Sequence, residues 1–439
     1  MKRYALLLAS AAALSAGLAG CGSGGTSGSS SSGPQTVKLI TWENPPAVKV
    51  LKKIDTEFHQ KYPNITVEYQ TAANTAGGYQ TMQQTAIKSD STDLMGILPF
   101  EPLPKHPTIS NESDTQLWAT HDQFLALNGQ PWVKNFSKTD EATASYNGKI
   151  YGLVTGVYQY GVFYNKTIFT KYHLSVPTTY NQFIHVDQVL KSHGVTPLFV
   201  GLQNVGPVYL QFIWKPLMQE VWGTTLPHGT TLDAALWNGQ AKWTSPKFIE
   251  VLKRTKQVMQ YLEPNFAGVP WESMPGDFAN GKAAMLLDGS WDLPSVQQAN
   301  PKLQVGFFPF PGSNNASNNT PTTQGDLTFA VLANSKDKSA ALKWLNFFAQ
   351  PKIYAQYVNA TGISPSLTEG TFNSYSSQVL GTWFGKGESI NNLPALPTTG
   401  PYWDQTTNFP TAIMDMYQGK YTPNQVAKMY QSGWPQVIK

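Results

Sequence analysis

The chain has 439 residues, of which 41% are hydrophobic, 12% are aromatic and only 13% are charged, against about 25% charged in ordinary soluble domains. Its length allows two domains of ordinary size, and its net charge of +4 is too small and too dispersed to predict nucleic-acid binding. Cys21 is the only cysteine, so the sequence excludes a disulfide within the chain.

The first residues predict export from the cytoplasm. A short positive segment is followed by an apolar stretch over residues 4–19, which is too short to remain in a bilayer as a spanning helix. The stretch ends in Leu-Ala-Gly-Cys at positions 18–21, which resembles the lipobox of bacterial lipoproteins. We therefore expect residues 1–20 to be a signal peptide and Cys21 to carry a lipid; an ordinary secretory signal with a chance cysteine is the alternative.

A segment of Gly and Ser follows the cysteine. Residues 22–33 contain only these two residue types and one Thr, so they have nothing apolar to bury. We expect residues 21–35 to form a flexible tether between the lipid and a folded body. No later segment approaches the ~20 consecutive apolar residues of a membrane span. The low charge of the remaining sequence agrees with an acidic habitat.

Arginine is almost absent from the chain. It occurs only at Arg3 and Arg254, and Arg254 lies in a helical pattern that is typical of a surface. Tight sites for carboxylates or phosphates often rely on the paired hydrogen bonds of an arginine side chain. The composition therefore favours an uncharged ligand over an anion, although lysine can also bind anions.

Strands and helices alternate from residue 37 onward. Alternating apolar residues predict a strand at 37–42, and Pro45-Pro46 opens a helix whose apolar residues recur at three- and four-residue spacing as far as Tyr62. Along the chain we then predict a strand at 65–69, a helix at 80–88, a strand at 94–98, an extended segment at 153–164, helices at 183–190 and 248–262, a strand at 283–287, and helices at 340–348 and from 423. This order favours parallel β-α-β units in an α/β protein of two lobes, each with a mainly parallel sheet.

Several short motifs occur in a fixed order. They are ITW at 40–42, EFHQKYPNI at 57–65, NGKIYGL at 147–153, FYNK at 163–166, VPTT at 176–179, FANGKAAM at 278–285, DGSW at 288–291 and NSKDK at 334–338. Together, behind the lipobox-like segment, they resemble the extracellular solute-binding proteins of the maltose-binding type (family 1), which are the sugar-binding subunits of ABC importers. The resemblance runs from residue 37 to the C-terminus.

The resemblance implies a periplasmic-binding-protein-like fold, in which a hinge of several crossings joins the two lobes and the ligand is trapped between them. By position, lobe one combines residues 36–155 with 325–364, and lobe two combines 156–324 with 365–439. The implied partners are a carbohydrate, the permease subunits of an ABC transporter, and the membrane through the lipid on Cys21. We expect an extracytoplasmic monomer that uses no cofactor.

The chain departs from the family pattern at two places. Val154 stands where relatives usually have proline, and Ser364-Pro365-Ser366 replaces an ending in which some relatives aim an arginine at the ligand. These departures concern the pocket and leave the expected fold unchanged.

Sugars present hydroxyls around weakly apolar ring faces, so a binding site needs flat aromatic side chains beside carboxylates or amides. Residues of these types follow predicted strands and crossings, at the ends where an open α/β sheet binds its ligands. Among Tyr158 and Tyr160 we expect one to face inward and prefer Tyr158. The candidates for ligand contact are Trp42, Glu43, Asn44, Phe100, Glu101, Tyr158, Tyr209, Trp222, Trp271, Trp291, Asp292, Asp326, Trp403 and Asp404.

Two of these candidates are implied by the resemblance, because relatives place tryptophans against the sugar at the positions of Trp291 and Trp403. For the others a structural role stays open. Core packing is the alternative for Trp42, solvation for Glu101 and a turn cap for Asp326. Core or rim packing is the alternative for Tyr209, Trp222 and Trp271.

Three other functions compete with sugar transport. A secreted carbohydrate-active enzyme needs two carboxylates at a defined separation, which one sequence cannot test, but no hydrolase motif, His-Glu-x-x-His helix or phosphate loop occurs. The histidines lack metal-ligand spacing, so we predict no metal site and no catalytic residue. The same fold with another ligand, such as a polyamine, a metal chelate or a phosphodiester, is the second rival, and a non-transport adhesin or sensor lipoprotein is the third. The many tryptophans favour an oligosaccharide over a monosaccharide.

Overall fold

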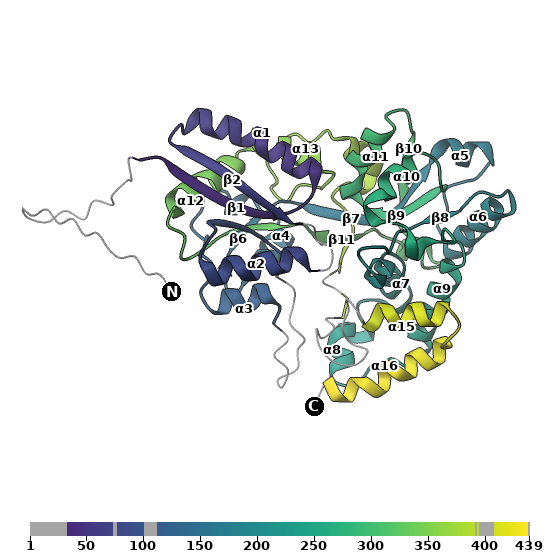
Figure 1. The fold of residues 1–439 in the computed structure, drawn as a ribbon. Helices are drawn as coiled ribbons and strands as arrows, with labels where there is room; N and C mark the ends of the chain where they lie inside the picture. Colours follow the sequence, from purple (N-terminus) through teal and green to yellow (C-terminus); the bar gives the residue numbers. More distant parts are fainter. Residues whose placement is uncertain (1–32, 73–76, 101–111, 391–392, 395–407, 438–439) are drawn as a thin grey trace, which may run out of the picture.

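The computed structural model describes residues 33–72, 77–100, 112–390, 393–394 and 408–437. These residues form two α/β bodies, each around its own sheet (Figure 1). We call the body around the five-stranded sheet lobe one and the body around the six-stranded sheet lobe two. Among the described residues, no helix has both the length and the apolar character that crossing a membrane requires.

The sheet of lobe one has the strand order β2-β1-β3-β12-β6. Strand β1 pairs in parallel with β2 and β3, whereas β12 pairs antiparallel with β3 and β6. The strands are β1 (Gln35–Trp42), β2 (Ile65–Ala72), β3 (Leu94–Ile97), β6 (Gly152–Val154) and β12 (Thr328–Val331). The helices and the small hairpin of this lobe are α1 (Pro45–Lys61), α2 (Gly78–Ser89), α3 (Asp114–Thr120), α4 (Lys138–Thr143), β4 (Ser145–Tyr146), β5 (Lys149–Ile150), α12 (Lys338–Phe348) and α13 (Pro351–Thr361).

Helix α1 begins and packs for reasons that are visible in its sequence. The Oδ1 of Asn44 accepts a hydrogen bond from the backbone N–H of Ala47 at 3.1 Å and so caps the first turn, which the two prolines after Asn44 also favour. Leu51, Ile54 and Phe58 share one face and are buried in the core of lobe one. In Figure 1, α1 and α13 lie side by side on one face of the sheet and α2 lies on the other.

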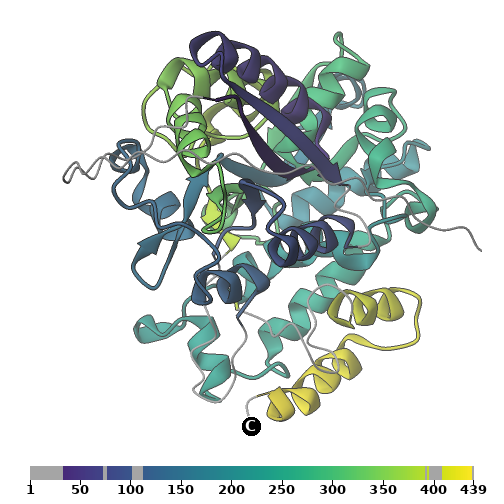
Figure 2. The same cartoon turned by 60° about the vertical axis from the view of Figure 1, so that its left-hand side comes forward.

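The sheet of lobe two has the strand order β13-β11-β7-β9-β8, and β10 also pairs with β7. Its strands are β7 (Val157–Asn165), β8 (Leu198–Phe199), β9 (Met285–Gly289), β10 (Val305–Phe308), β11 (Thr322–Gly325) and β13 (Glu388–Ser389). Its helices are α5 (Lys166–Lys171), α6 (Tyr180–Ser192), α7 (Gln211–Leu217), α8 (Leu232–Trp237), α9 (Pro246–Met259), α10 (Met274–Ala279), α11 (Leu293–Ala299), α14 (Tyr375–Leu380), α15 (Asn408–Tyr417) and α16 (Pro423–Val437). Figures 1 and 2 show α15 and α16 together at the end of lobe two that lies away from α1.

Each lobe has its own hydrophobic core. In lobe one, Trp344 of α12 is fully buried and stacks on Phe348 at a ring-centroid distance of 5.2 Å. In lobe two, Trp243 is fully buried and contacts Trp222, Phe248 and the helix α16 through Trp434. Helix α16 therefore packs into the body of lobe two and is part of its core.

Three crossings join the two lobes in the part of the chain that the structure describes. Strand β6 leads into β7, and β11 leads into β12, so that one antiparallel pair of segments runs through both sheets. The third crossing connects α13 to α14, and it lies beside the first, where Val157 and Ser364 exchange backbone hydrogen bonds of 2.9 and 2.8 Å. We call these three segments, residues 154–157, 325–328 and 363–367, the hinge.

The prediction of an α/β protein is confirmed, but the expectation of mainly parallel sheets needs a correction, because both sheets are mixed. Two neighbouring parallel strands require a long crossover connection, usually a helix, that brings the chain back to the end of the sheet where the first strand began. Here β7 pairs antiparallel with β9, β10 and β11, and β12 pairs antiparallel with both of its neighbours, since the chain enters and leaves each lobe through the hinge.

Candidate functional site between the two lobes

Trp291 lies at the junction of the lobes. Strand β9 ends at Gly289, and residues Ser290–Asp292 make one 3-10 turn before α11 begins. A Cβ atom on Gly289 would lie only 1.9 Å from Cζ3 of Trp291, so the indole lies directly over the backbone of this glycine. The half-buried Trp291 packs against the cores of both lobes. It is therefore placed where a ligand held between the lobes would meet it.

Three further rings surround the indole. Tyr158 and Tyr160 meet Trp291 edge to face, with ring centroids 4.9 and 5.4 Å away, and Phe212 of α7 lies at 5.9 Å. The expectation that only one of the two tyrosines faces inward is wrong, because residues two apart on a strand share a face. Both rings therefore belong to what we call the aromatic cluster: Tyr158, Tyr160, Tyr209, Phe212, Trp271 and Trp291.

Tyr209 and Trp271 extend the aromatic cluster along lobe two. The ring of Tyr209 lies 5.2 Å from Phe212 and 5.6 Å from Trp271, and both residues are half-buried. Such a row of partly exposed rings offers flat apolar surfaces, the kind of surface on which a sugar ring can lie.

Two carboxyl groups lie beside the aromatic cluster. Asp288 is fully buried at the end of β9, where its Oδ1 accepts a hydrogen bond from the backbone N–H of Gly289 at 2.8 Å. Burial, and then the neighbouring carboxyl of Asp292, raises the pKa of Asp288 well above its usual range, and burial raises the pKa of Asp292 to about 6. Burial and these two carboxyls also raise the pKa of the Tyr209 hydroxyl.

Several polar atoms around the aromatic cluster have no hydrogen-bond partner of normal geometry among the described residues. They are the Oδ2 atoms of Asp288 and Asp292 and the Nε1 atoms of Trp271 and Trp291. Buried polar groups are nearly always satisfied by protein, water or ligand. Asp292 also interacts with the side chains of Asp288 and Trp291, so these polar groups form one buried network beside the apolar ring faces.

Asp326 lies in the hinge and not on an open surface. Its Oδ2 accepts a hydrogen bond from the Thr155 hydroxyl at 2.7 Å, and its Oδ1 accepts one from the Tyr158 hydroxyl at 2.5 Å. Burial raises the pKa of Asp326 above its usual range, and these two hydrogen bonds partly oppose the rise. The carboxyl thus binds groups of the protein itself.

Three further predicted residues, at the end of β1, make no ring contact or hydrogen bond with the aromatic cluster in the described part of the chain. Trp42 is half-buried beside Tyr79, with ring centroids 6.2 Å apart, and Glu43 is exposed. Asn44 uses its side-chain oxygen to cap α1.

Two of the predicted aromatic residues lie within the cores. Phe100 stacks on Tyr146 in lobe one, and Trp222 packs against Trp243 and Phe248 in lobe two. Glu101, Trp403, Asp404 and Cys21 lie outside the described residues.

Sequence reasoning did not select Tyr160, Phe212 or Asp288. The two-residue period of a strand places Tyr160 on the same face as Tyr158, so this period is the signal that identifies both. Asp288 belongs to the motif at 288–291 that carries Trp291, so its position was a usable signal. Phe212 precedes the irregular π-helical turn Met218–Trp222, and no motif marks it.

The arginine at position 254 is occupied away from the aromatic cluster. Its guanidinium lies over the ring of Tyr180 at 4.4 Å, pairs with Glu250 at 2.8 Å and donates to the carbonyl of Gly312. Its side chain is only 17% exposed, so the surface position expected from the sequence is wrong. The described part of the site therefore contains no arginine for an anionic ligand.

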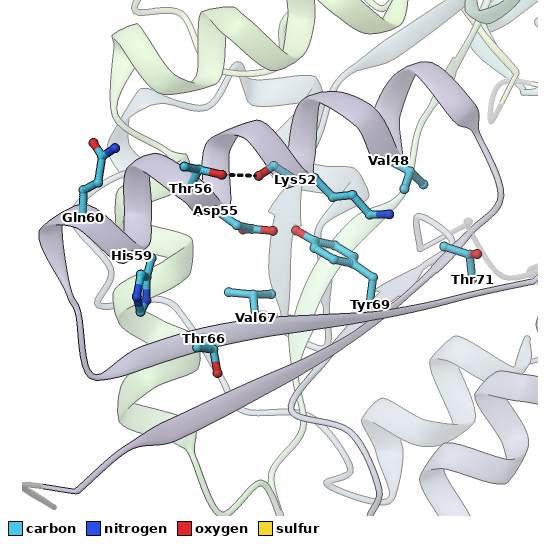
Figure 3. A pocket seen from close by; sticks show the side chains of 10 residues that line it. All are labelled: Val48, Lys52, Asp55, Thr56, His59, Gln60, Thr66, Val67, Tyr69 and Thr71. Atoms are coloured by element: carbon cyan, nitrogen blue, oxygen red, sulfur yellow. Dashed lines mark hydrogen bonds between the residues drawn. The ribbon is translucent and has the colours of Figure 1, made fainter.

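A concave feature lies on lobe one alone (Figure 3). This groove of about 540 Å³ is lined only by residues of α1 and β2. Asp55 and Tyr69 point toward each other there, and Asp55 accepts a hydrogen bond from Nε1 of Trp344 at 2.7 Å. Because no residue of lobe two lines it, this groove cannot respond to a ligand that bridges the lobes.

Comparison with known proteins identifies the family. The model of the family described as bacterial extracellular solute-binding protein matches residues 43–355. The chain belongs to this family. The family predicted from the sequence motifs is thereby confirmed.

Curated relatives of this solute-binding protein include sugar-binding proteins. The chain is 24% identical over 335 residues to the multiple sugar-binding protein of Streptococcus mutans, covering 73% of this chain and 72% of that one. It is 22% identical over 265 residues to the melibiose/raffinose/stachyose-binding protein MelE of Bacillus subtilis, covering 58% of this chain and 61% of that one.

Solved structures of solute-binding proteins share the fold. A sugar transporter from Bacillus licheniformis in complex with stachyose is similar with a TM-score of 0.71 and 18% identity, covering 92% of this chain and 100% of that one. A chitin oligosaccharide binding protein is similar with a TM-score of 0.74 and 19% identity, covering 92% and 98%. These likenesses confirm the predicted two-lobe α/β fold.

Proposed function

We propose that this solute-binding protein binds a neutral oligosaccharide between its two lobes and delivers it to an ABC transporter. The observation that carries the proposal is the position of Trp291, which contacts the cores of both lobes and lies among three other rings. A sugar that stacks on this cluster would touch both lobes and favour the state in which they are closed. Relatives whose names state that they bind sugars support this choice of ligand.

The electrostatics of the site support a neutral ligand over a polyamine. A polyamine requires ionised carboxylates, but burial raises the pKa of both Asp288 and Asp292 and so favours their neutral forms. A protonated carboxyl can instead donate a hydrogen bond to a sugar hydroxyl. Two other predicted carboxyls could pair with a polyamine, but Glu43 is exposed and Asp326 is hydrogen-bonded within the hinge.

The proposal includes the predicted division of the chain, with lobe one at 36–155 and 325–364 and lobe two at 156–324 and 365–439. The placement of β11 and β12 in different sheets supports a crossing near residue 325. It also includes an extracytoplasmic monomer anchored by a lipid on Cys21, for which the sequence at 18–21 is the support. A Cys21→Ser variant should move from the membrane fraction to the medium, and retention in the membrane would contradict the anchor.

A thermal-shift screen of the protein tests the ligand class. The panel contains raffinose-type sugars, malto-, xylo- and chitin oligosaccharides, polyamines and sugar phosphates. A ligand at a hundred times its dissociation constant adds about 2.7 kcal/mol to the free energy of unfolding. We expect one series of neutral sugars to raise the midpoint and to be recovered uncleaved by chromatography. A shift with spermidine alone, or cleavage of the sugar, would replace the proposal with one of its rivals.

A further inference from the structure

The first two hinge crossings form a continuous ribbon. The N–H of Thr155 donates to the carbonyl of Leu327 at 3.0 Å, and the N–H of Asp326 donates to the carbonyl of Gly156 at 2.8 Å. On either side of these bonds, Thr328 pairs with Val154 in lobe one and Gly325 with Val157 in lobe two. The backbone ladder is therefore unbroken between the sheets, and the side chains on this ribbon determine how it bends.

The carboxyl of Asp326 connects different parts of this ribbon. It is 2% exposed and accepts hydrogen bonds from Thr155 on the first crossing and from Tyr158 on β7. Within the described residues, no ion pair links Asp326 to a lysine or arginine. The backbone N–H of Leu327 and the side chain of Tyr357 on α13 add to these two hydroxyl donors, and loss of the Tyr158 hydroxyl removes the donor that reaches the aromatic cluster.

Tyr158 extends this connection to the aromatic cluster. Its hydroxyl is held by Asp326, while its ring meets Trp291 edge to face at 4.9 Å. A single rigid side chain therefore spans the distance from the hinge carboxyl to the indole that we propose as the ligand contact. Because its hydroxyl is used inside the protein, Tyr158 is not itself needed as a hydrogen-bond partner of the ligand.

Tyr160 provides a natural comparison. It lies two residues further along β7 and meets the same indole at 5.4 Å with nearly the same ring orientation, 84° against 81°. Its hydroxyl, however, bonds to the side chain of Gln324 on β11, within the sheet of lobe two. The two tyrosines thus share the ring contact and differ in whether the hydroxyl reaches the hinge carboxyl.

We infer that Tyr158 is a positioning residue that couples the bending of the hinge to the placement of Trp291. When the ribbon bends, Asp326 moves the hydroxyl end of Tyr158, and the ring carries the movement to the indole. In the reverse direction, a ligand that fixes Trp291 restricts the hinge to one bend. The inference rests on the proposed function in so far as Trp291 contacts the ligand, but the mechanical link exists in the free protein as well.

The distance between the lobes can be measured with two spin labels. In a Cys21→Ser background, which removes the only natural cysteine, labels are attached at Lys53→Cys on α1 and Lys253→Cys on α9, both exposed positions. Pulsed electron resonance then gives the interlobe distance distribution of the free protein and of the protein with the sugar found in the screen. Circular dichroism of each variant confirms that it is folded.

Tyr158→Phe keeps the ring and removes the hydroxyl. We expect a broader or displaced distance distribution in the free protein, and a weaker affinity for the sugar because less of the free protein holds the lobes in the binding-competent arrangement. Tyr160→Phe should leave the distance distribution as in the parent. Asp326→Asn keeps one acceptor for Tyr158, so its distance distribution should be intermediate between those of Tyr158→Phe and Tyr160→Phe. It serves as the second variant if Tyr158→Phe does not fold.

A distance distribution of Tyr158→Phe identical to that of the parent would overturn the inference, even if the melting temperature falls, since a merely structural role predicts only the latter. An equal change in Tyr160→Phe would overturn it too. Failure of the parent to bind any sugar would contradict the proposed function, while the free-protein distances would still decide the inference.

Discussion

The absence of a side chain at Gly289 determines where Trp291 can lie. The indole occupies the space directly above the last residue of β9, and three rings hold it there. This arrangement places a large, rigid and partly exposed aromatic surface between two cores. A binding site of this kind depends on the backbone beneath the ring as much as on the ring itself.

We predict that Gly289→Ala will weaken sugar binding by tenfold or more, because its Cβ would lie 1.9 Å from the indole and displace it. Gly276→Ala on α10 is the matched control, since nothing lies within 4 Å of its added Cβ. Titration calorimetry measures both. Equal affinities for Gly289→Ala and the parent would show that the indole's position does not matter for binding.

At the scale of single residues, the sequence could identify Trp291 and Tyr158 but not their surroundings. Trp291 lies in a recognisable motif, and Tyr158 lies near a predicted crossing. Phe100 and Trp222 are aromatic candidates of the same kind, but they lie in the cores, where they are 4% and 3% exposed. Whether such a ring is buried or partly exposed depends on the residues that pack over it. Those residues, such as Tyr146 and Trp243, are far away in the sequence or carry no motif.

At the scale of elements, the three crossings of the hinge pack closely against one another. Gly156 lies where they meet, and an added Cβ would be 2.5 Å from Cδ1 of Ile363 and 2.6 Å from the carbonyl oxygen of Ser364. That carbonyl also accepts the hydrogen bond from Val157. The third crossing can therefore lie against the first only because position 156 has no side chain.

Gly156→Ala should lower the free energy of unfolding by about 1–3 kcal/mol, the usual cost of overpacking a tight interior. Urea denaturation measures this, with Gly276→Ala again as the control because its Cβ meets open space. A variant as stable as the parent would mean that the crossings separate at no cost.

Helices with long apolar periodicity were predictable, and short helices were not. Helices α1 and α9 have 17 and 14 residues, so their buried faces repeat several times in the sequence. Helices α8 and α10 have 6 residues each, too few for a period to show. The antiparallel pairing of β7 with β9 joins segments more than a hundred residues apart, and no local pattern specifies it.

At the scale of the whole molecule, buried carboxyl groups occur in both lobes. Burial raises the pKa of Asp55, Asp140 and Asp292 from 3.8 to about 6, and it raises those of Asp187, Glu220 and Asp288 well above the usual range. None of these six carboxyls takes part in an ion pair among the described residues, where the pairs involve Asp122, Glu250, Asp277 and Asp415 instead. Burial therefore makes each of these groups easier to protonate than an exposed carboxyl.

We predict that the protein is more stable in mild acid than at neutral pH. A carboxyl whose pKa rises on folding binds protons more tightly in the folded chain, so its contribution to stability is complete below pH 3.8 and is lost as the pH rises through about 6. The thermal midpoint should therefore be higher at pH 5 than at pH 8, by about 5 °C or more.

Asp187 provides the variant that tests the cause. It is fully buried with both carboxyl oxygens unpartnered among the described residues, so Asp187→Asn should reduce the difference between the two pH values. Asp122→Asn, whose side chain is 82% exposed in the parent, should not. A midpoint that is higher at pH 8 than at pH 5 would contradict the account of the buried carboxyls.

The central claim is that a neutral sugar binds between the lobes against Trp291. Titration calorimetry of the parent and of Trp291→Ala with the sugar from the screen tests it most directly. Trp118→Ala, which removes another half-buried tryptophan from the edge of the lobe-one core, is the control. We predict binding of one sugar per chain, weakened by about 2 kcal/mol or more in Trp291→Ala, as for a central aromatic anchor, and unchanged in Trp118→Ala. An unchanged dissociation constant in Trp291→Ala would contradict the claim.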